Sequence, residues 1–180
     1  MPLVQTVPLA MPLPEIRTER LRLRGLVPAD APALARHAGD RRVAEATRSI
    51  PHPLPEGAED GFIAAALSPE RDEDVWAIDA GAGLVGVISL KPLDRGQSQI
   101  GYWIAPEVWG AGLASEAVRA LVAANPHNAR TLFAEVFQDN PASARVLAHA
   151  GFDYIGDAEA HCLARGGRAV PTWTYLRRMV

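Results

Sequence analysis

The residues best suited to bind a phosphorylated ligand lie close together between positions 101 and 117. Gly110 and Gly112 lack side chains, so their backbone N–H groups could come close to a pyrophosphate. A helix beginning near Leu113 would add unpaired N–H donors and the positive end of its dipole. The dipole alone contributes only about 0.3–1 kcal/mol per charge, so several N–H contacts are required. The pattern predicts an anion site at a strand-to-helix turn.

A glycine pair is a weak signal by itself, because an ordinary strand-to-helix turn has the same composition. A Rossmann dinucleotide site is disfavoured, because it needs a third glycine at a fixed spacing and parallel strands around it. A second segment, one strand later, makes the pattern more specific. Asn140 is suited to cap a helix, Pro141 to occupy its first turn and Gly151 to end it. Together the two segments indicate a ligand site more strongly than either does alone.

The elements that position these two segments follow from hydrophobic periodicity. Alternating polar and apolar residues predict a strand at 20–24, and a helix is expected to begin at Asp30. Three further strands separated by short turns indicate an antiparallel meander, and a strand–helix–strand unit after Pro106 adds one parallel crossover. The result is an α+β fold. The other expected strands are 75–78, 84–90, 97–105, 131–137, 152–156 and 172–178, and the other expected helices are about 60–67, about 113–124 and roughly eleven residues after Asn140.

Size and composition fit one domain. The chain has 180 residues, of which 48% are hydrophobic and 22% are charged, and these fractions are typical of soluble globular proteins. We expect an extended arm at 1–15, which has four prolines and lacks the basic region of a signal peptide, followed by a single domain at 16–180. No run approaches the roughly 18 apolar residues that a membrane span needs, so no membrane partner is expected.

Charge and cysteine content argue against other classes of protein. The net charge of -3 and the scattered arginines give no basic stripe, so we expect no nucleic-acid partner. Cys162 is the only cysteine, so no intrachain disulfide can form, which fits the cytoplasmic location that we expect. The five histidines show no metal-ligand spacing, and no bound metal is expected.

Taken in their order and spacing, these segments resemble the GNAT acetyltransferase superfamily, and within it the group that includes the ribosomal-protein N-terminal acetyltransferases. The resemblance covers nearly the whole chain. It implies a mixed, mostly antiparallel central sheet with flanking helices, in which central strands splay apart to leave a cofactor cleft. The matching segments are 18–24, which resembles the first strand of that group, 101–106 and 109–117, which resemble its acetyl-CoA motif, and 140–143 with Gly151 and Phe152, which resemble its last motif.

The resemblance also implies acetyl-CoA as co-substrate, with direct attack by an amine acceptor in a ternary complex. Backbone groups of Trp103, Ile104 and Ala105 would pair with pantetheine, and an N–H there could polarise the thioester carbonyl. The cofactor-binding residues expected in this way are Trp103, Ile104, Ala105, Trp109, Gly110, Ala111, Gly112, Leu113, Ala114, Asn140 and Ser143.

The group that would protonate the departing thiolate differs from that of many relatives. Those relatives have a tyrosine seven residues after the asparagine, where this chain has Leu147. The ribosomal-protein group is similar to this chain in placing a serine three residues after the asparagine. Ser143 is therefore the catalytic candidate that would hydrogen-bond or protonate the thiolate. As a residue of the first helical turn, Ser143 could equally be a small packing residue.

Two further positions depart from the family pattern. Relatives often carry a glutamate base where this chain has Gln99, which does not titrate. Either the base is a histidine or an acidic residue of 72–74, or the amine arrives neutral and Gln99 only positions it, or catalysis has weakened. Glu107 occupies the first position of the phosphate loop, where relatives often have glutamine or arginine, and it brings negative charge towards a pyrophosphate.

The acceptor is open between a protein or peptide N-terminus and a small-molecule amine. An α-amino group, with a pKa of about 7.7–8.0, is partly neutral at pH 7, whereas a lysine amine with a pKa of about 10.4 is almost wholly charged. The resemblance favours the peptide N-terminus. A CoA-binding protein with weak or no turnover is the alternative from another class. Relatives are monomers or homodimers, and the same two states are expected here.

Overall fold

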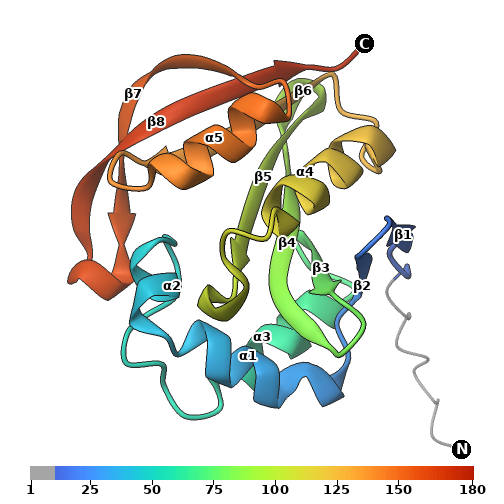
Figure 1. Cartoon of the computed structure of the whole chain (residues 1–180), viewed down its shortest axis with the longest axis vertical. Coiled ribbons are helices and arrows are strands. Elements are labelled where there is room, and N and C mark those ends of the chain that lie inside the picture. Colours follow the sequence, from blue (N-terminus) through green and yellow to red (C-terminus); the bar gives the residue numbers. More distant parts are fainter. Residues whose placement is uncertain (1–10) are drawn as a thin grey trace, which may run out of the picture.

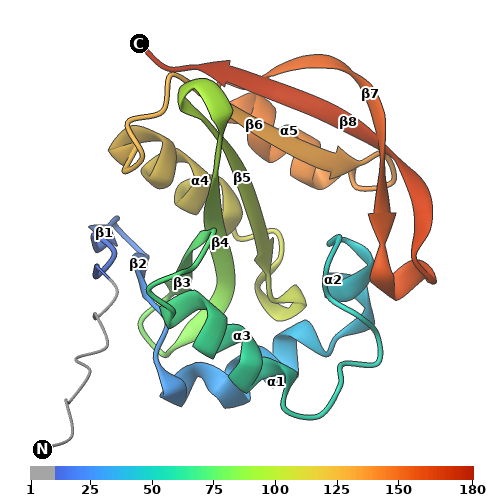
Figure 2. The same ribbon diagram turned by 180° about the vertical axis from the view of Figure 1, so that it is seen from behind.

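The computed structural model describes residues 11–180, so most of the arm expected at 1–15 lies outside the described residues. The described chain forms one sheet in the order β1-β2-β3-β4-β5-β6-β8-β7, flanked by helices (Figures 1 and 2). Neighbouring strands are antiparallel except for β5 and β6, so the expected α+β fold with a mostly antiparallel sheet is confirmed. The strands are β1 (Ile16–Arg17), β2 (Arg22–Gly25), β3 (Asp74–Asp79), β4 (Leu84–Leu93), β5 (Gln97–Ile104), β6 (Thr131–Phe137), β7 (Asp153–Cys162) and β8 (Arg168–Arg178).

The helices match the prediction where apolar periodicity and caps are strong. The α4 helix (Leu113–Ala124) has the expected bounds, and α5 (Pro141–His149) begins directly after Asn140 but is a little shorter than expected. The α2 helix (Arg41–Glu45) was not predicted, because five residues are too few to show a helical period. No helix within residues 11–180 has the length and hydropathy needed to cross a membrane. The remaining helices are α1 (Ala31–Ala38) and α3 (Ala58–Leu67).

The last two strands are much longer than the predicted segments 152–156 and 172–178. They pair as a long antiparallel ribbon at one edge of the sheet (Figure 1). Most residues of β7 are exposed, whichever face of the strand they occupy. A strand that is exposed to solvent on both faces shows no alternation of polar and apolar residues. The hydrophobic pattern therefore did not predict the full length of β7.

In the centre of the sheet, β5 and β6 pair over only a short stretch. Only three residue pairs join these parallel strands, from Gln97 opposite Thr131 to Gln99 opposite Phe133. Beyond these pairs, β5 continues to Ile104 and β6 continues to Phe137, but the two strands no longer pair with each other. Figure 2 shows them running apart. This is the splay that the resemblance implied.

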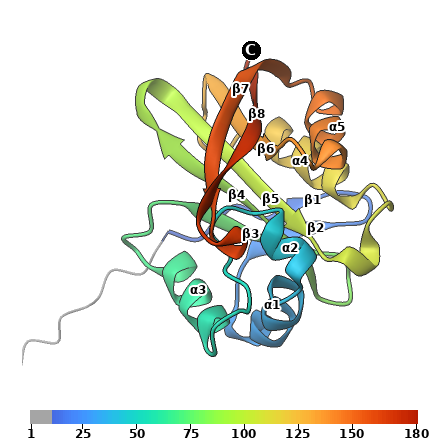
Figure 3. The ribbon, with the colours of Figure 1, turned by 90° about the vertical axis from the view of Figure 1, so that its left-hand side faces the viewer.

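Helices α4 and α5 lie on one face of the sheet and α1 and α3 on the other (Figure 3), with an apolar core under each pair. On one face, Leu121 of α4 and Leu147 of α5 pack into the larger core. On the other face, Leu34 of α1 and Ile63 of α3 pack against Val87 of β4. The splay between β5 and β6 therefore lies between two faces that are each covered by helices.

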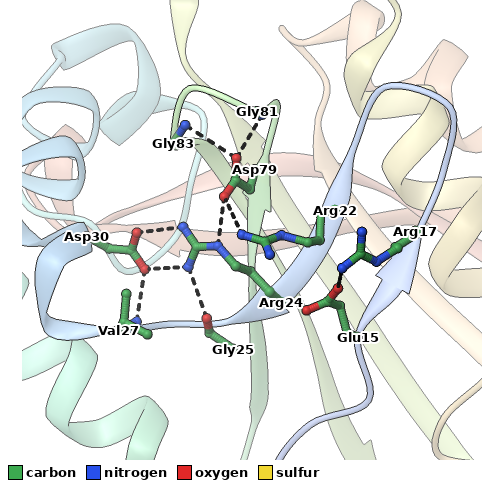
Figure 4. A network of polar contacts seen from close by, with 10 residues as sticks. All are labelled: Glu15, Arg17, Arg22, Arg24, Gly25, Val27, Asp30, Asp79, Gly81 and Gly83. Carbon is green, nitrogen blue, oxygen red and sulfur yellow. Dashed lines mark hydrogen bonds and ion pairs between the residues drawn. The ribbon is translucent and has the colours of Figure 1, made fainter.

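An ion network ties β2 to β3 and to the start of α1 (Figure 4). Arg24 Nε donates to Asp79 Oδ2 (2.8 Å), and its two terminal nitrogens each donate to Asp30 (2.9 Å). Arg22 Nη2 donates to Asp79 as well (3.2 Å). Burial by itself would raise the pKa of Asp79, but hydrogen bonds from Arg24, the Gly81 N–H and Arg22 outweigh it and lower the pKa to about 2.

The helix expected at Asp30 does begin there, because α1 starts at Ala31. The Asp30 side chain, however, makes no capping bond to α1. It accepts instead from the Val27 N–H (2.9 Å) and from Arg24. The predicted start of the helix is therefore correct, but the Asp30 side chain does not cap α1 by a hydrogen bond.

The described end of the expected arm contacts the rest of the chain. The Pro14 carbonyl accepts a hydrogen bond from Trp76 Nε1 (2.9 Å), and the Met11 carbonyl accepts one from Arg71 Nη2 (3.0 Å). Leu13 packs against the larger core. The domain boundary after residue 15 stays a prediction.

Candidate active site

The end of β5 presents backbone groups to the gap between β5 and β6. The Ala105 N–H donates to the Val85 carbonyl on the β4 side (2.7 Å). Because successive peptide groups of a strand point to opposite sides, the Ile104 N–H and carbonyl face the gap. Trp109 Nε1 donates to that carbonyl (2.7 Å). The Ala105 N–H is therefore bonded within the sheet. The pairing of the 103–105 backbone with pantetheine stays a prediction.

The loop before α4 has the space and the donors that a phosphate group needs. Gly110 and Gly112 adopt left-handed φ angles of 79° and 78°. Apart from chain neighbours, no atom lies within 4 Å of the position that a Gly110 Cβ would take. The N–H groups of Leu113 and Ala114 precede the Glu116 N–H, which bonds to the Gly112 carbonyl (3.1 Å). Amides before the first helical bond are those that a helix N-terminus offers to an anion.

Glu107, at the start of this loop, has an arginine and a histidine of α1 as neighbours. Arg36 Nη2 donates to the Glu107 carboxylate (2.7 Å), and His37 Nδ1 lies 3.5 Å from it. The Glu107 side chain is 48% exposed, so these contacts contribute little to stability. They do reduce the negative charge that Glu107 was expected to bring towards a pyrophosphate.

Arg20 is a cation beside the phosphate loop that sequence reasoning missed. Its Nη1 donates to the Ala111 carbonyl (2.8 Å), and its Nε donates to Glu116 Oε2 (2.7 Å). Glu116 also accepts from Thr18 Oγ1 (2.5 Å) and the Arg20 N–H (3.0 Å). Burial tends to raise the pKa of Glu116, and these hydrogen bonds lower it overall. Glu116 therefore holds Arg20 against the loop in addition to facing the helix dipole.

The N-terminus of α5 and strand β5 are linked by two hydroxyl groups. Asn140 Oδ1 accepts from the Ser143 N–H (3.2 Å), as a helix cap does. Ser143 Oγ lies 2.7 Å from the Tyr102 hydroxyl, which also donates to the Ser143 carbonyl (3.1 Å). Burial raises the pKa of Tyr102, so the phenol keeps its proton at neutral pH. Leu147 is fully buried in the core.

On the opposite face, a cavity of about 670 Å³ lies over the splay. Gln99 and Gly101 lie in its floor, and Gly101 is exposed although it belongs to a central strand. Tyr102 also lines the cavity, and its hydroxyl contacts Ser143 of α5. Its apolar walls include Ile50, Phe62, Val75, Val87, Trp103 and Phe137.

Two carboxylates line this cavity, and they differ in their partners. Glu135 Oε2 accepts from Arg48 Nη1 (3.1 Å), and Glu135 Oε1 accepts from Thr172 Oγ1 (3.0 Å). Glu73 Oε1 accepts from Ser89 Oγ (2.5 Å), and within residues 11–180 it has no ion-pair partner. Glu73 is thus the lining carboxylate without a cationic partner among the described residues.

The two other acids of the 72–74 region are already paired. Asp72 lies 3.2 Å from Lys91 Nζ and is largely exposed. Asp74 accepts from Arg71 Nε (2.6 Å) and lies 2.9 Å from His127 Nε2. Burial would raise the pKa of Asp74, but the bonds from Arg71 and His127 lower it overall. Among the acidic residues of 72–74, Glu73 alone lines the cavity, and it has no ion-pair partner within residues 11–180.

The structure brings the predicted residues to two sides of the splay. The 109–114 loop, Asn140 and Ser143 belong to the α4–α5 side, and Gln99 lies in the floor of the cavity on the other side. Tyr102 lies inside the predicted 101–106 motif, but the sequence assigned that motif only backbone roles. No cluster of three or more His, Cys, Asp and Glu side chains able to hold a metal occurs between residues 11 and 180.

Comparison with solved structures places this fold among acetyltransferases. The microcin C7 self-immunity acetyltransferase MccE, solved with acetyl-CoA and AMP, is similar with a TM-score of 0.79 and 16% identity, over 90% of this chain and 94% of that one. RimL, a ribosomal L7/L12 α-N-protein acetyltransferase solved with CoA, is similar with a TM-score of 0.77 and 20% identity, over 92% and 98% of the chains. Spermidine N-acetyltransferase from Vibrio cholerae, solved with CoA and spermine, gives a TM-score of 0.75 and 17% identity, over 89% and 96%.

Sequence comparison identifies the family. No curated protein matches the chain at the sequence level. The family model for the acetyltransferase (GNAT) domain matches residues 20–153, which include the phosphate loop, both hydroxyl groups at the splay and the first turn of α5. The chain therefore belongs to the GNAT acetyltransferase family and is an acetyl-CoA-dependent N-acetyltransferase.

Proposed function

We propose that this enzyme transfers the acetyl group to a single α-amino group at the N-terminus of a protein or peptide. The supporting observation is the cavity at the splay, with apolar walls and Glu73 as its one lining carboxylate without an ion pair. Its volume of about 670 Å³ lies within the usual range for ligand sites. One free carboxylate suits one ammonium group, whereas a polyamine carries several positive charges along its length.

The cofactor half of the proposal rests on the α4 side. The 110–114 backbone and Arg20 would bind the pyrophosphate, because this loop combines left-handed glycines, helix N-terminal donors and a cation. The Ile104 N–H would pair with pantetheine or polarise the thioester carbonyl, since it faces the gap between β5 and β6. Asn140 would keep Ser143 in the first turn of α5, at the wall of the same gap.

The chemistry would proceed by direct attack. Glu73 would take one proton from the ammonium group, and the neutral amine would then form the N–C bond as the C–S bond breaks. The second proton, which the nitrogen loses as it becomes an amide, would pass to water in the open cavity. Gln99, which does not titrate, would orient the acceptor by hydrogen bonding. The electron pair of the broken bond would stay on sulfur, next to Ser143. An α-amine needs less help than a lysine side chain, because its pKa of about 7.7–8.0 is much closer to neutral pH.

The first test is CoA release from acetyl-CoA with a panel of short peptides that differ only in their N-terminal residue. The same peptides with a blocked α-amine are the matched controls, and free amino acids, polyamines and aminoglycosides complete the panel. We expect release with at least one free peptide and none with its blocked form. Release with a small amine alone would replace the peptide proposal. Tight acetyl-CoA binding without release across the panel would refute it in favour of a binding protein.

A further inference from the structure

The hydroxyl groups of Ser143 and Tyr102 contact each other directly beside the splay. Their oxygens lie 2.7 Å apart, and the Tyr102 oxygen is also 3.1 Å from the Ser143 carbonyl. Tyr102 comes from β5 and Ser143 from the first turn of α5, so the contact bridges the sheet and the helix across the gap. Both distances are within normal hydrogen-bonding range.

Two arrangements of the hydroxyl protons keep the two hydroxyl oxygens hydrogen-bonded to each other. In the first, Tyr102 donates to the Ser143 carbonyl and Ser143 donates to the Tyr102 oxygen, so neither proton is left for a ligand. In the second, Tyr102 donates to Ser143 Oγ, and the Ser143 proton is free. A neutral thioester sulfur is a weak acceptor, whereas a thiolate is a strong one. The appearance of negative charge on sulfur therefore favours the second arrangement.

We propose that Tyr102 is a positioning residue for the leaving group: its hydroxyl donates to Ser143 Oγ as the thioester breaks, which leaves the Ser143 proton to donate to the departing sulfur. The inference rests on the role proposed above for Ser143. The C–S electron pair stays on sulfur, and CoA departs as a thiolate held by the Ser143 hydroxyl. Tyr102 keeps its own proton throughout.

The surroundings of Tyr102 suit a donor that is never ionised. Its ring packs against the larger core, and burial raises the pKa of its phenol. Tyr175 of β8 is the ionisable neighbour whose charge acts in the same direction. A chain of hydrogen bonds that ends on an anion is stronger than its separate bonds, because each donor polarises the next. Tyr102 thus strengthens Ser143 as a donor without touching the sulfur.

The test measures the thiol of bound CoA, so it needs no acceptor. The ultraviolet absorbance of the thiolate is followed from acid to alkaline pH for CoA saturating the full-length enzyme and its variants. In Tyr102→Phe we expect the midpoint of this titration to rise by about one pH unit, as the loss of one hydrogen bond to a charged system implies. Ser143→Ala should raise the midpoint at least as much. Tyr154→Phe removes an exposed tyrosine hydroxyl of β7 and is the matched control, with an unchanged midpoint.

The double variant decides whether Tyr102 acts through Ser143. Tyr102→Phe should add nothing to the midpoint in a Ser143→Ala background, because its partner is already gone. An equal shift in both backgrounds, or no shift in Tyr102→Phe itself, would overturn the proposal. The unfolding temperature and the CoA dissociation constant are measured for each variant, and both should stay near the wild-type values. If the thiolate titration midpoint shifts in Tyr102→Phe but no peptide releases CoA from acetyl-CoA, the role of Tyr102 stands and only the proposed acceptor is refuted.

Discussion

The ion network between β2 and β3 and the cavity over the splay both contain carboxylates, but the carboxylates differ in whether a cation is paired with them. In the network, Arg24 lies between Asp30 and Asp79, so each carboxylate has a cation within hydrogen-bonding distance. In the cavity over the splay, the Glu73 carboxylate accepts a hydrogen bond from the Ser89 hydroxyl and has no ion-pair partner among residues 11–180. An ion pair fixes both of its members, whereas a hydroxyl can turn and leaves the charge of its partner uncompensated.

If the proposed function is correct, charges that hold the fold are paired with each other, and the charge that would meet the acceptor is not. Removing a member of the network should lower stability and spare turnover. Removing a polar group at the splay should lower turnover and spare stability. The four substitutions below test this division, and they run from the largest to the smallest expected effect on the reaction.

Glu73→Gln should reduce kcat/KM for the best acceptor about 100-fold at pH 7, because a positioned base contributes roughly 10²–10⁴-fold. The rate of CoA release at low acceptor concentration measures this. Asp72→Asn is the matched control, since Asp72 is exposed and already lies beside Lys91. A wild-type rate in Glu73→Gln would assign Glu73 to structure and remove it from the reaction.

Ser143→Ala should lower kcat about tenfold while the acetyl-CoA dissociation constant stays within about twofold, because a hydrogen bond to a charged group is worth about 1.5–3 kcal/mol. Steady-state kinetics and calorimetric binding give the two quantities. Ser68→Ala, after α3, controls for the loss of a serine hydroxyl elsewhere. Equal losses in kcat and in binding would instead indicate that Ser143 only packs α5.

Arg20→Ala tests an intermediate case, because Arg20 is ion-paired and also lies beside the phosphate loop. We expect the acetyl-CoA dissociation constant to rise about threefold at low salt and less at high salt, since exposed charges are screened. Arg17→Ala removes a paired and highly exposed arginine of β1 as the control. A rise that salt does not reduce would mean that Arg20 acts by packing the loop.

Asp79→Asn should leave kcat at 25 °C unchanged and lower the free energy of unfolding by about 1–3 kcal/mol at pH 7. The folded pKa of Asp79 is lowered to about 2. The unfolded pKa of an aspartate is about 3.9. Its contribution is therefore fully present above roughly pH 4 and is lost as the pH falls towards 2. Urea unfolding at several pH values should show a shallower acid dependence in the variant, and an identical dependence would contradict this assignment.

The sequence predicted those parts of the fold that have a strong local signal. The α4 helix and β6 have the expected bounds, because apolar residues recur there with a clear period. The cap at Asn140 was also predicted correctly, because a capping residue acts on its own first turn. The extent of β7 was missed because an exposed edge strand carries no such signal.

The candidate site was only partly predictable, because its contacts join distant segments. Tyr102 and Ser143 are 41 positions apart, and Arg20 and Ala111 are 91 apart. Strand register and helix packing decide such contacts, and neither can be read from one segment. The sequence could name the 72–74 region as a source of the base. Only the pairing of Asp72 with Lys91 and of Asp74 with Arg71 distinguishes Glu73 within it.

The three residue pairs between β5 and β6 have a thermodynamic consequence. A co-substrate bound in the gap, as proposed above, would contact both parts of a sheet that has few pairs there, and it would bind the native chain in preference to the unfolded chain. Binding and unfolding are therefore linked, and a co-substrate at 100 times its dissociation constant adds about 2.7 kcal/mol to the free energy of unfolding. Resistance to heat and to proteolysis should thus rise and fall with the supply of acetyl-CoA.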